Sequence, residues 1–220
     1  LKNTIKNKKK VIVTGAGGFL GKSVVLKLIK NNYHVISIDL KNPNIKSSNH
    51  RYFKSTVKSF FLKKKIYNIY SIIHLAADPR NDHYYLKPEL AIENISNLMI
   101  ILNNLKKLKI KPSLIFSSTK QIEKDYLTGN SGPYSISKKT CEELIKFYSK
   151  NYGLKFHILR LSDIFSKINN PKNKALNRIL NKSKNNQNIF IDNKGHNFEY
   201  VNIDVICEGI IKILDKKLNY

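Results

Sequence analysis

The stretch VIVTGAGGFLG, residues 11–21, decides the fold of this chain. A short apolar run typical of a buried strand passes directly into a cluster of glycines, and an apolar, helix-like segment follows. Gly15, Gly18 and Gly21 form the pattern G-x-x-G-x-x-G between the two. In such a pattern the first glycine permits the turn, the second lets the backbone approach a pyrophosphate, and the third allows close packing of strand and helix. The N-terminus of the helix adds partial positive charge.

Because this pattern also occurs in ordinary turns, its context has to decide between a loose turn and a phosphate-binding loop. A second strand-like run, residues 33–40, carries Asp39 near its end. This lies close to the separation of roughly 20 residues expected for a carboxylate that binds a ribose diol. A carboxylate there repels a 2′-phosphate, so the position favours NAD over NADP. The alternative is that Asp39 only ends a strand.

The rest of the chain alternates between short apolar runs and longer amphipathic segments up to about residue 165. The predicted strands include residues 71–77, 112–119 and 154–162, and the predicted helices include residues 19–32, 87–110 and 134–153. This alternation predicts an α/β fold, a doubly wound parallel sheet with helices on both faces. Beyond residue 165 the rhythm breaks into polar, Asn- and Lys-rich sequence, which predicts a lobe laid over the sheet.

The net charge of +25 comes almost entirely from lysine. Asn and Ile are also abundant, and an AT-rich coding sequence enriches all three residue types. Nucleic-acid sites favour arginine for bidentate contacts and interleave aromatic side chains. The composition therefore favours solvated surface lysines and no nucleic-acid partner.

Other features exclude further classes of protein. No apolar run reaches the length of about 18 residues that a membrane span needs, so we expect no membrane partner. Cys141 and Cys207 and the scattered histidines lack metal-ligand spacing, so we expect no metal site. The apolar run that follows the basic start of the sequence is too short for a signal-peptide core, so we expect a cytoplasmic protein. The two cysteines are more simply buried than paired in a disulfide.

Tyr134 and Lys138, in the sequence YSISK, form a second constellation. Four residues apart on a helix, the two side chains share one face, and an ammonium near a phenol lowers the phenol pKa from about 10. Such a tyrosine can take or return a proton at a substrate hydroxyl while hydride moves to a nicotinamide. Just before it, Ser117, Ser118 and Thr119 end a predicted strand, at the sheet edge where such folds bind ligands.

Together these motifs resemble the extended short-chain dehydrogenase/reductase family, in its NAD-dependent epimerase/dehydratase group, which acts mainly on nucleotide sugars. TGAGGFLG, SIDL, IIHLAA, IENI, IFSST, YSISK and LRLSDIF occur in the family's order. The resemblance implies a Rossmann domain over residues 1–165 and a partial substrate-binding lobe over residues 166–220. It implies NAD contacts from Gly15, Gly18, Phe19, Leu20, Asp39, Leu40, Leu75, Ala76, Ala77, Tyr134, Lys138 and Leu161.

The resemblance also implies catalytic roles for Thr119, Tyr134 and Lys138, and contacts with the nucleotide sugar from Asp78, Thr119, Asp163 and Arg178. Asn94 matches a position that is often Asn in this family. Asp163 stands where many members have Asn. The segment KGHNFEYVNIDV lacks an arginine with which many members hold the substrate phosphate, and the resemblance leaves Arg178 as the residue to take that role.

Departures from the family pattern narrow the chemistry. Sugar dehydratases of this family follow the catalytic Thr with an Asp–Glu pair, but this chain has Lys120 and Gln121, so dehydration is disfavoured. We therefore expect an NAD-dependent nucleotide-sugar epimerase, similar to UDP-glucose 4-epimerase. The alternatives are a sugar dehydrogenase/reductase of the same family and a non-catalytic relative that only binds a dinucleotide. The sequence ends short of a typical member, so a truncated substrate lobe is expected, and the resemblance allows a homodimer.

Overall fold

A six-stranded parallel sheet organises the computed structural model, which describes residues 9–123, 132–166, 175–190 and 199–215. The strands follow the order β3-β2-β1-β4-β5-β6 across the sheet. Their bounds are β1 (Lys10–Thr14), β2 (His34–Asp39), β3 (His50–Lys54), β4 (Ser71–His74), β5 (Ser113–Thr119) and β6 (Phe156–Leu161). The strand order reverses direction between β1 and β4, which is the switch point of a doubly wound nucleotide-binding sheet. The predicted fold class is confirmed.

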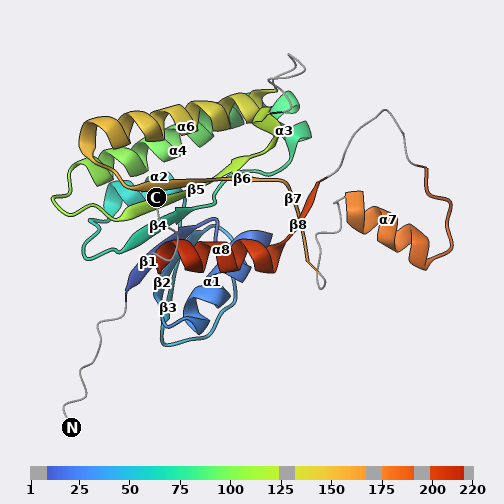
Figure 1. The fold of residues 1–220 in the computed structure, drawn as a ribbon, viewed down its shortest axis with the longest axis horizontal. Coiled ribbons are helices and arrows are strands. Elements are labelled where there is room, and N and C mark those ends of the chain that lie inside the picture. The colour runs from blue at the N-terminus through green and yellow to red at the C-terminus, as the bar shows by residue number, and fades with distance from the viewer. Residues whose placement is uncertain (1–8, 124–131, 167–174, 191–198, 216–220) are drawn as a thin grey trace, which may run out of the picture.

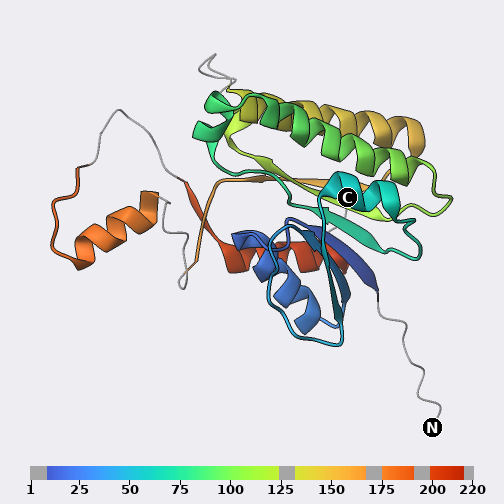
Figure 2. The ribbon, with the colours of Figure 1, turned by 180° about the vertical axis from the view of Figure 1, so that it is seen from behind.

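Helices cover both faces of this sheet (Figures 1 and 2). One face carries α1 (Phe19–Lys30) and α8 (Ile203–Leu214), and the other carries α2 (Val57–Lys63), α4 (Glu89–Lys106) and α6 (Pro133–Tyr152). The short α3 (Asn81–Leu86) precedes α4, and α7 (Ala175–Lys184) lies apart from the sheet in Figure 1. Helices on both faces bury the central strands β1 and β4 on both sides, which explains their apolar sequences.

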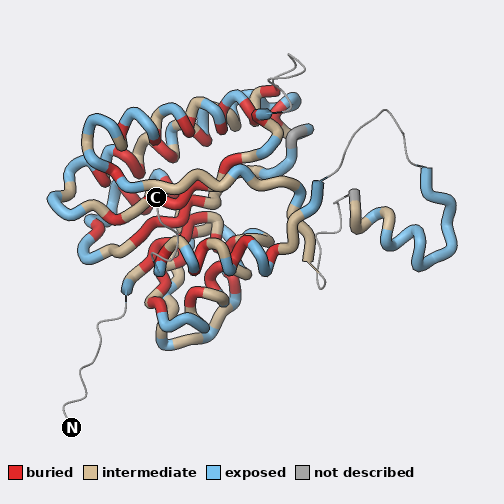
Figure 3. The backbone as a smooth tube through the Cα atoms, in the orientation of Figure 1, coloured by how far each residue is buried: buried red, intermediate tan, exposed pale blue. Residues whose placement is uncertain are grey.

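Two hydrophobic cores result, one on each face of the sheet. Val11 and Val13 of β1 belong to the core that α1 and α8 share. Ile12, between them, belongs to the core shared with α2, α4 and α6. This alternation follows from the two-residue period of a strand, which sends successive side chains to opposite faces. Figure 3 shows the buried residues gathered along the strands and the inward sides of the helices.

The C-terminal part of the described chain returns to this sheet. The short strand β7 (Asp163–Phe165) pairs in parallel with β8 (Tyr200–Asn202), and α8 follows directly. Near the end of α8, the Tyr33 hydroxyl donates a hydrogen bond of 2.7 Å to Asp215, and the Tyr70 hydroxyl donates one of 2.6 Å to the Leu214 carbonyl. Helix α8 therefore shares the core of the sheet. The predicted domain boundary at residue 165 stays a prediction.

Two further observations bear on the sequence analysis. Across the four described ranges, no helix combines the length and the apolar character needed to cross a membrane. Cys141 and Cys207 are both buried, and both carry free thiols. Burial raises the pKa of each thiol, of Cys141 to about 12 and of Cys207 to about 11, so both are packing residues and unreactive near neutral pH.

Candidate active site

A cavity of about 1530 Å³ opens at the carboxyl-terminal edge of the sheet. The turns that follow β1, β2, β4, β5 and β6 contribute to it, together with the start of α6. Of the predicted site residues, those that line the cavity are Gly15, Gly18, Phe19, Leu20, Asp39, Leu40, Leu75, Ala76, Ala77, Asp78, Thr119, Tyr134, Lys138, Leu161 and Asp163. Arg178, on α7, is not among the described residues that line it. The carboxyl ends of parallel strands meet at one edge, which is why residues so far apart in the sequence converge here.

Two of the glycines in the turn after β1 serve the fold. Gly15 has a φ of +72°, in the left-handed region, and a Cβ atom there would lie 2.7 Å from the Ala76 amide nitrogen. A Cβ atom at Gly21 would overlap the Gly15 carbonyl oxygen. The backbone of the turn therefore packs too closely on residues 75–76, which follow β4, and on itself to accept a side chain at either position.

Gly18 differs from both. Its backbone, with φ of −75° and ψ of 173°, is open to any residue, and a Cβ atom would meet only the Gly15 carbonyl oxygen, at 3.2 Å, among the described residues within 4 Å. Gly18 is also the N-cap of α1, and no side chain caps the helix there. A bare backbone and an uncapped helix N-terminus beside the cavity fit the pyrophosphate of a dinucleotide.

Asp39 is anchored at the end of β2. One carboxylate oxygen accepts the Gly17 amide at 2.9 Å, and the other accepts the Lys41 amide at 2.8 Å. A Cβ atom at Gly17 would overlap the Lys41 carbonyl oxygen, so this glycine is what brings the two turns together. Gly17 lies outside the G-x-x-G-x-x-G pattern, so the spacing of the glycines indicates no role for it. The resulting carboxylate lines the cavity, in a position that fits a ribose diol.

Tyr134 and Lys138 both lie on α6 and both line the cavity, and the ammonium of Lys138 is hydrogen-bonded to the backbone of β5. The Lys138 ammonium donates a hydrogen bond of 2.8 Å to the Ser117 carbonyl and lies 5.8 Å from the centre of the Tyr134 ring. Burial lowers the pKa of Lys138 to about 8. Burial also raises the pKa of Tyr134 above its ordinary value, and Tyr84 and Asp78 add to the rise. The expected depression of the Tyr134 pKa is therefore not present in this structure, because burial of the phenol dominates.

A buried phenol, that of Tyr84, packs against Tyr134. The ring centres of Tyr84 and Tyr134 are 5.0 Å apart. The Tyr84 hydroxyl donates to the Asp78 carbonyl at 3.0 Å and accepts from the Asn94 amide at 2.9 Å, and Asn94 also donates to Ser137 at 3.1 Å. Asn94 thus joins α3 and α4 to the first turns of α6. Tyr84 belongs to no sequence motif, so no signal could have found it.

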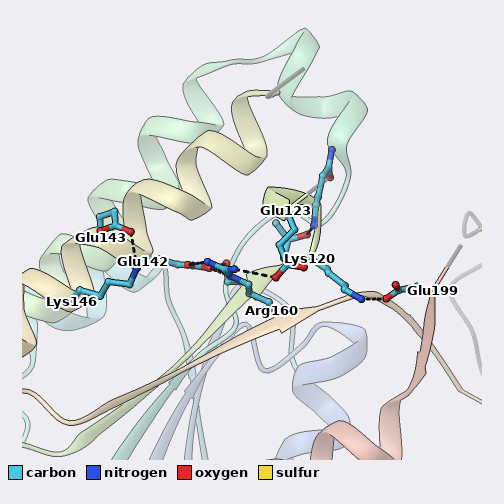
Figure 4. A network of polar contacts seen from close by, with 10 residues as sticks. Lys120, Glu123, Glu142, Glu143, Lys146, Arg160 and Glu199 are labelled. Atoms are coloured by element: carbon cyan, nitrogen blue, oxygen red, sulfur yellow. Dashed lines mark hydrogen bonds and ion pairs between the residues drawn. The ribbon is translucent and has the colours of Figure 1, made fainter. Parts of the chain in front are cut away.

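Charged groups at the rim of the cavity form ion pairs. Asp78 accepts two hydrogen bonds from the Arg80 guanidinium, at 3.0 and 2.9 Å, and lies 2.9 Å from the His83 ring nitrogen. Burial alone would raise the pKa of Asp78, but these hydrogen bonds hold it below its usual range. Lys120, after β5, pairs with Glu199, before β8 (Figure 4). Two cations that line the cavity, Arg80 and Lys120, are therefore already partnered by carboxylates.

His74, on β4, is buried and structural. One of its ring nitrogens lies 2.7 Å from the Thr14 hydroxyl, and burial lowers its pKa to about 3, so it is neutral at physiological pH. Within the part of the chain that the structure describes, no group of three or more His, Cys, Asp or Glu side chains is arranged to hold a metal ion.

Comparison with known proteins agrees with this geometry. The sequence model of the NAD dependent epimerase/dehydratase family matches residues 11–219. A Methanocaldococcus jannaschii protein, to which UDP-glucose 4-epimerase activity is provisionally assigned, is 30% identical over 211 residues, covering 87% of this chain and 69% of that protein. Among solved structures, the UDP-glucuronic acid 4-epimerase of Bacillus cereus, in complex with UDP-glucuronic acid and NAD, is 26% identical. Its TM-score is 0.81, and the match covers 96% of this chain and 74% of that one. The Thermotoga maritima UDP-glucose 4-epimerase shares the fold, with 24% identity, a TM-score of 0.79 and coverage of 93% and 72%.

Proposed function

Because this chain belongs to the NAD dependent epimerase/dehydratase family, we propose that it inverts one carbinol centre of a nucleotide sugar by reversible oxidation, as a 4-epimerase does. The observation that carries this proposal is that Thr119, Tyr134 and Lys138 line the same cavity as the glycine turn and Asp39. A relative of 26% identity binds UDP-glucuronic acid and NAD, which supports both the substrate class and the cofactor.

The glycine turn, the uncapped start of α1 and Asp39 would hold NAD, the first two at its pyrophosphate and Asp39 at a ribose diol. The backbone of residues 75–77 and Leu161 would line its path along the carboxyl ends of β4 and β6. When bound, NAD supplies a reversible acceptor for the hydride of the sugar carbon. Asp39 places negative charge where NADP would carry a phosphate, so NAD is the cofactor that fits.

Tyr134 is the proposed general base and acid. Its phenolate takes the proton of the sugar hydroxyl as the carbon is oxidised, and the phenol returns the proton when the ketone is reduced from its opposite face. Burial works against the phenolate, so Tyr134 needs positive charge close by. Lys138 supplies one, because a pKa of about 8 leaves it largely protonated at pH 7. The Thr119 hydroxyl would orient the reacting oxygen.

The neighbours of these residues argue against dehydration. Elimination of water needs a further acid and base beside the sugar. Lys120, already paired with Glu199, and Gln121 stand at the two positions after Thr119. Asp78 and Asp163 line the same cavity, and we propose that they contact the sugar. The role of Arg178 on the substrate diphosphate stays a prediction.

The decisive experiment screens nucleotide sugars by NMR for a product inverted at C4. Tyr134→Phe should lower kcat by about 10²–10⁴ while NAD binding stays nearly intact, the range for losing an acid–base group. Tyr152→Phe, at the other end of the same helix, is the matched control and should turn over at the wild-type rate. Undiminished turnover by Tyr134→Phe would show that the role assignment is wrong, and NAD bound without turnover of any sugar would favour the non-catalytic alternative.

We also propose that the chain forms a homodimer in the cytoplasm. Helices α4 and α6 pack side by side and leave Ile92, Ile136 and Phe147 exposed, with exposed fractions of 70%, 51% and 55%. Contiguous exposed apolar surface marks an interface between subunits, and we infer that these side chains on the two neighbouring helices contribute to one such surface. Sedimentation velocity of the wild type and of Phe147→Glu measures the oligomeric state of each and so tests the proposed dimer. The two free thiols are consistent with a reducing compartment such as the cytoplasm. We propose that the nucleotide sugar inverted there is a precursor for polysaccharide biosynthesis.

A further inference from the structure

Two consecutive residues at the carboxyl end of β5 are hydrogen-bonded to side chains of α6. Lys138 donates to the Ser117 carbonyl at 2.8 Å, and the Ser118 hydroxyl donates to the Glu142 carboxylate at 2.5 Å. Thr119, the next residue along the strand, lines the cavity together with Tyr134. Tyr134, Lys138 and Glu142 follow one another at intervals of four, so all three share the face of α6 that packs on the end of β5.

Glu142 is the buried centre of this attachment. Its side chain is only 2% exposed, although it is charged. Arg160, on β6, grips the carboxylate with two hydrogen bonds of 3.0 and 2.7 Å and reaches Glu123 with a third of 3.1 Å (Figure 4). Burial by itself would raise the pKa of Glu142, but the bonds from Arg160 and Ser118 hold it below its usual range. An ionised carboxylate thus joins β5, α6 and β6 at one point, through Ser118, Glu142 and Arg160, which we call the β5–α6 clamp.

The adjacent residue provides a contrast. Glu143 is exposed, and its ion pair with Lys146, at 2.8 Å, stays within α6. Among the described residues this ion pair, drawn in Figure 4, links Glu143 to no second element, so it does not position one element against another. The two neighbouring glutamates therefore separate a general effect of negative charge on α6 from an effect of the clamp.

We propose that Glu142 is a positioning residue for the reaction: through the β5–α6 clamp it sets the placement of the Thr119 hydroxyl relative to the Tyr134 phenol. This rests on the proposed function, in which both groups act on one sugar hydroxyl. A misplacement of about 1 Å costs a reaction on the order of 10²-fold in rate, because reacting groups must start in near-attack geometry. The glycine turn and Asp39, where we place the pyrophosphate and a ribose diol of NAD, lie on β1, α1 and β2, and no hydrogen bond of the clamp among the described residues reaches these elements.

The test compares Glu142→Gln, which removes the charge and keeps the volume, with the matched control Glu143→Gln. Glu142→Gln should lower kcat by about 10-fold to 100-fold while KM and NAD affinity change less than about twofold. Glu143→Gln should behave as the wild type. Ser118→Ala, which removes one bond and leaves the ion pair with Arg160, should lower kcat by a smaller factor, and it decides the question if Glu142→Gln does not fold. A loss of activity that only follows the fraction of unfolded protein would overturn the proposal.

Amide hydrogen exchange tests the clamp without any turnover. In Glu142→Gln, the amides of residues 117–120 should exchange at least about 10-fold faster than in Glu143→Gln, while α8 serves as an unchanged internal reference. Equal exchange in the two variants would overturn the clamp. If the wild type turns over no nucleotide sugar, the proposed function fails, and the exchange comparison still decides whether Glu142 holds β5 in place.

Discussion

Gly18→Ala separates a glycine that serves a ligand from glycines that serve the fold. At Gly18, φ of −75° and ψ of 173° suit alanine, and the added methyl would meet only the Gly15 carbonyl oxygen, at 3.2 Å, among the described residues. The methyl would otherwise point into the space where we place the pyrophosphate. The variant should therefore fold as the wild type does and bind NAD poorly.

The magnitudes follow from these contacts. Alanine is a poorer N-cap than glycine by some tenths of a kcal/mol, and replacing glycine stabilises by about 0.4–1 kcal/mol through the unfolded chain, so these two effects nearly cancel. The 3.2 Å contact with the Gly15 carbonyl oxygen is tight and the turn must yield by a few tenths of an ångström, so the free energy of unfolding should fall by about 1 kcal/mol. An extra methyl in a tight contact costs about 1–3 kcal/mol. Taking about 2 kcal/mol, the Kd for NAD should rise about 30-fold.

Urea denaturation with and without NAD measures both quantities. At an NAD concentration of about 100 times the wild-type Kd, the cofactor should stabilise the wild type by about 2.7 kcal/mol and Gly18→Ala by only about 0.9 kcal/mol. Gly209→Ala, on α8, has no described atom within 4 Å of the added methyl and should keep the full increment. An unchanged increment in Gly18→Ala would refute the placement of the pyrophosphate. A large loss of stability without NAD would show that Gly18 serves the fold, as Gly21 does.

Two further predictions concern Asp39 and His74. Asp39→Gly combined with Lys41→Arg should shift preference toward NADP, because the carboxylate that repels the 2′-phosphate is removed and a guanidinium beside it can bind the phosphate with two hydrogen bonds. Titration of both cofactors measures this, and wild-type protein that binds NADP as tightly as NAD would contradict it. The folded-state pKa of His74 is about 3, below the ordinary value of about 6.5, so the unfolded chain takes up a proton first as pH falls. The contribution of neutral His74 to the free energy of unfolding is complete above pH 6.5 and is lost toward pH 3, by about 1.4 kcal/mol per pH unit. Urea titrations of His74→Asn between pH 7 and 4 should lack that slope. A slope identical to that of the wild type would contradict this role of His74.

The sequence by itself determines the parallel sheet, the glycine turn and the class of cofactor. These depend on local signals: the period of apolar residues, the positions of Gly15 and Gly21, and a carboxylate at the end of the second strand. The convergence of the predicted residues on one cavity follows as well, because the carboxyl ends of parallel strands must meet at one edge. The same reasoning does not extend to Arg178, because α7 follows no strand of the six-stranded sheet directly and its position relative to that edge is not set by strand pairing.

Only the tertiary structure decided which side chains contact one another and how burial changes their charge. The i, i+4 spacing of Tyr134 and Lys138 predicts a shared face, but the ammonium turns to the Ser117 carbonyl, and burial raises the phenol pKa. Tyr84 reaches Tyr134 from a different helix, and Glu142 meets Arg160 across a sheet edge. Such contacts depend on distances between elements and on exclusion of water, and neither quantity is encoded in the spacing of residues along the chain.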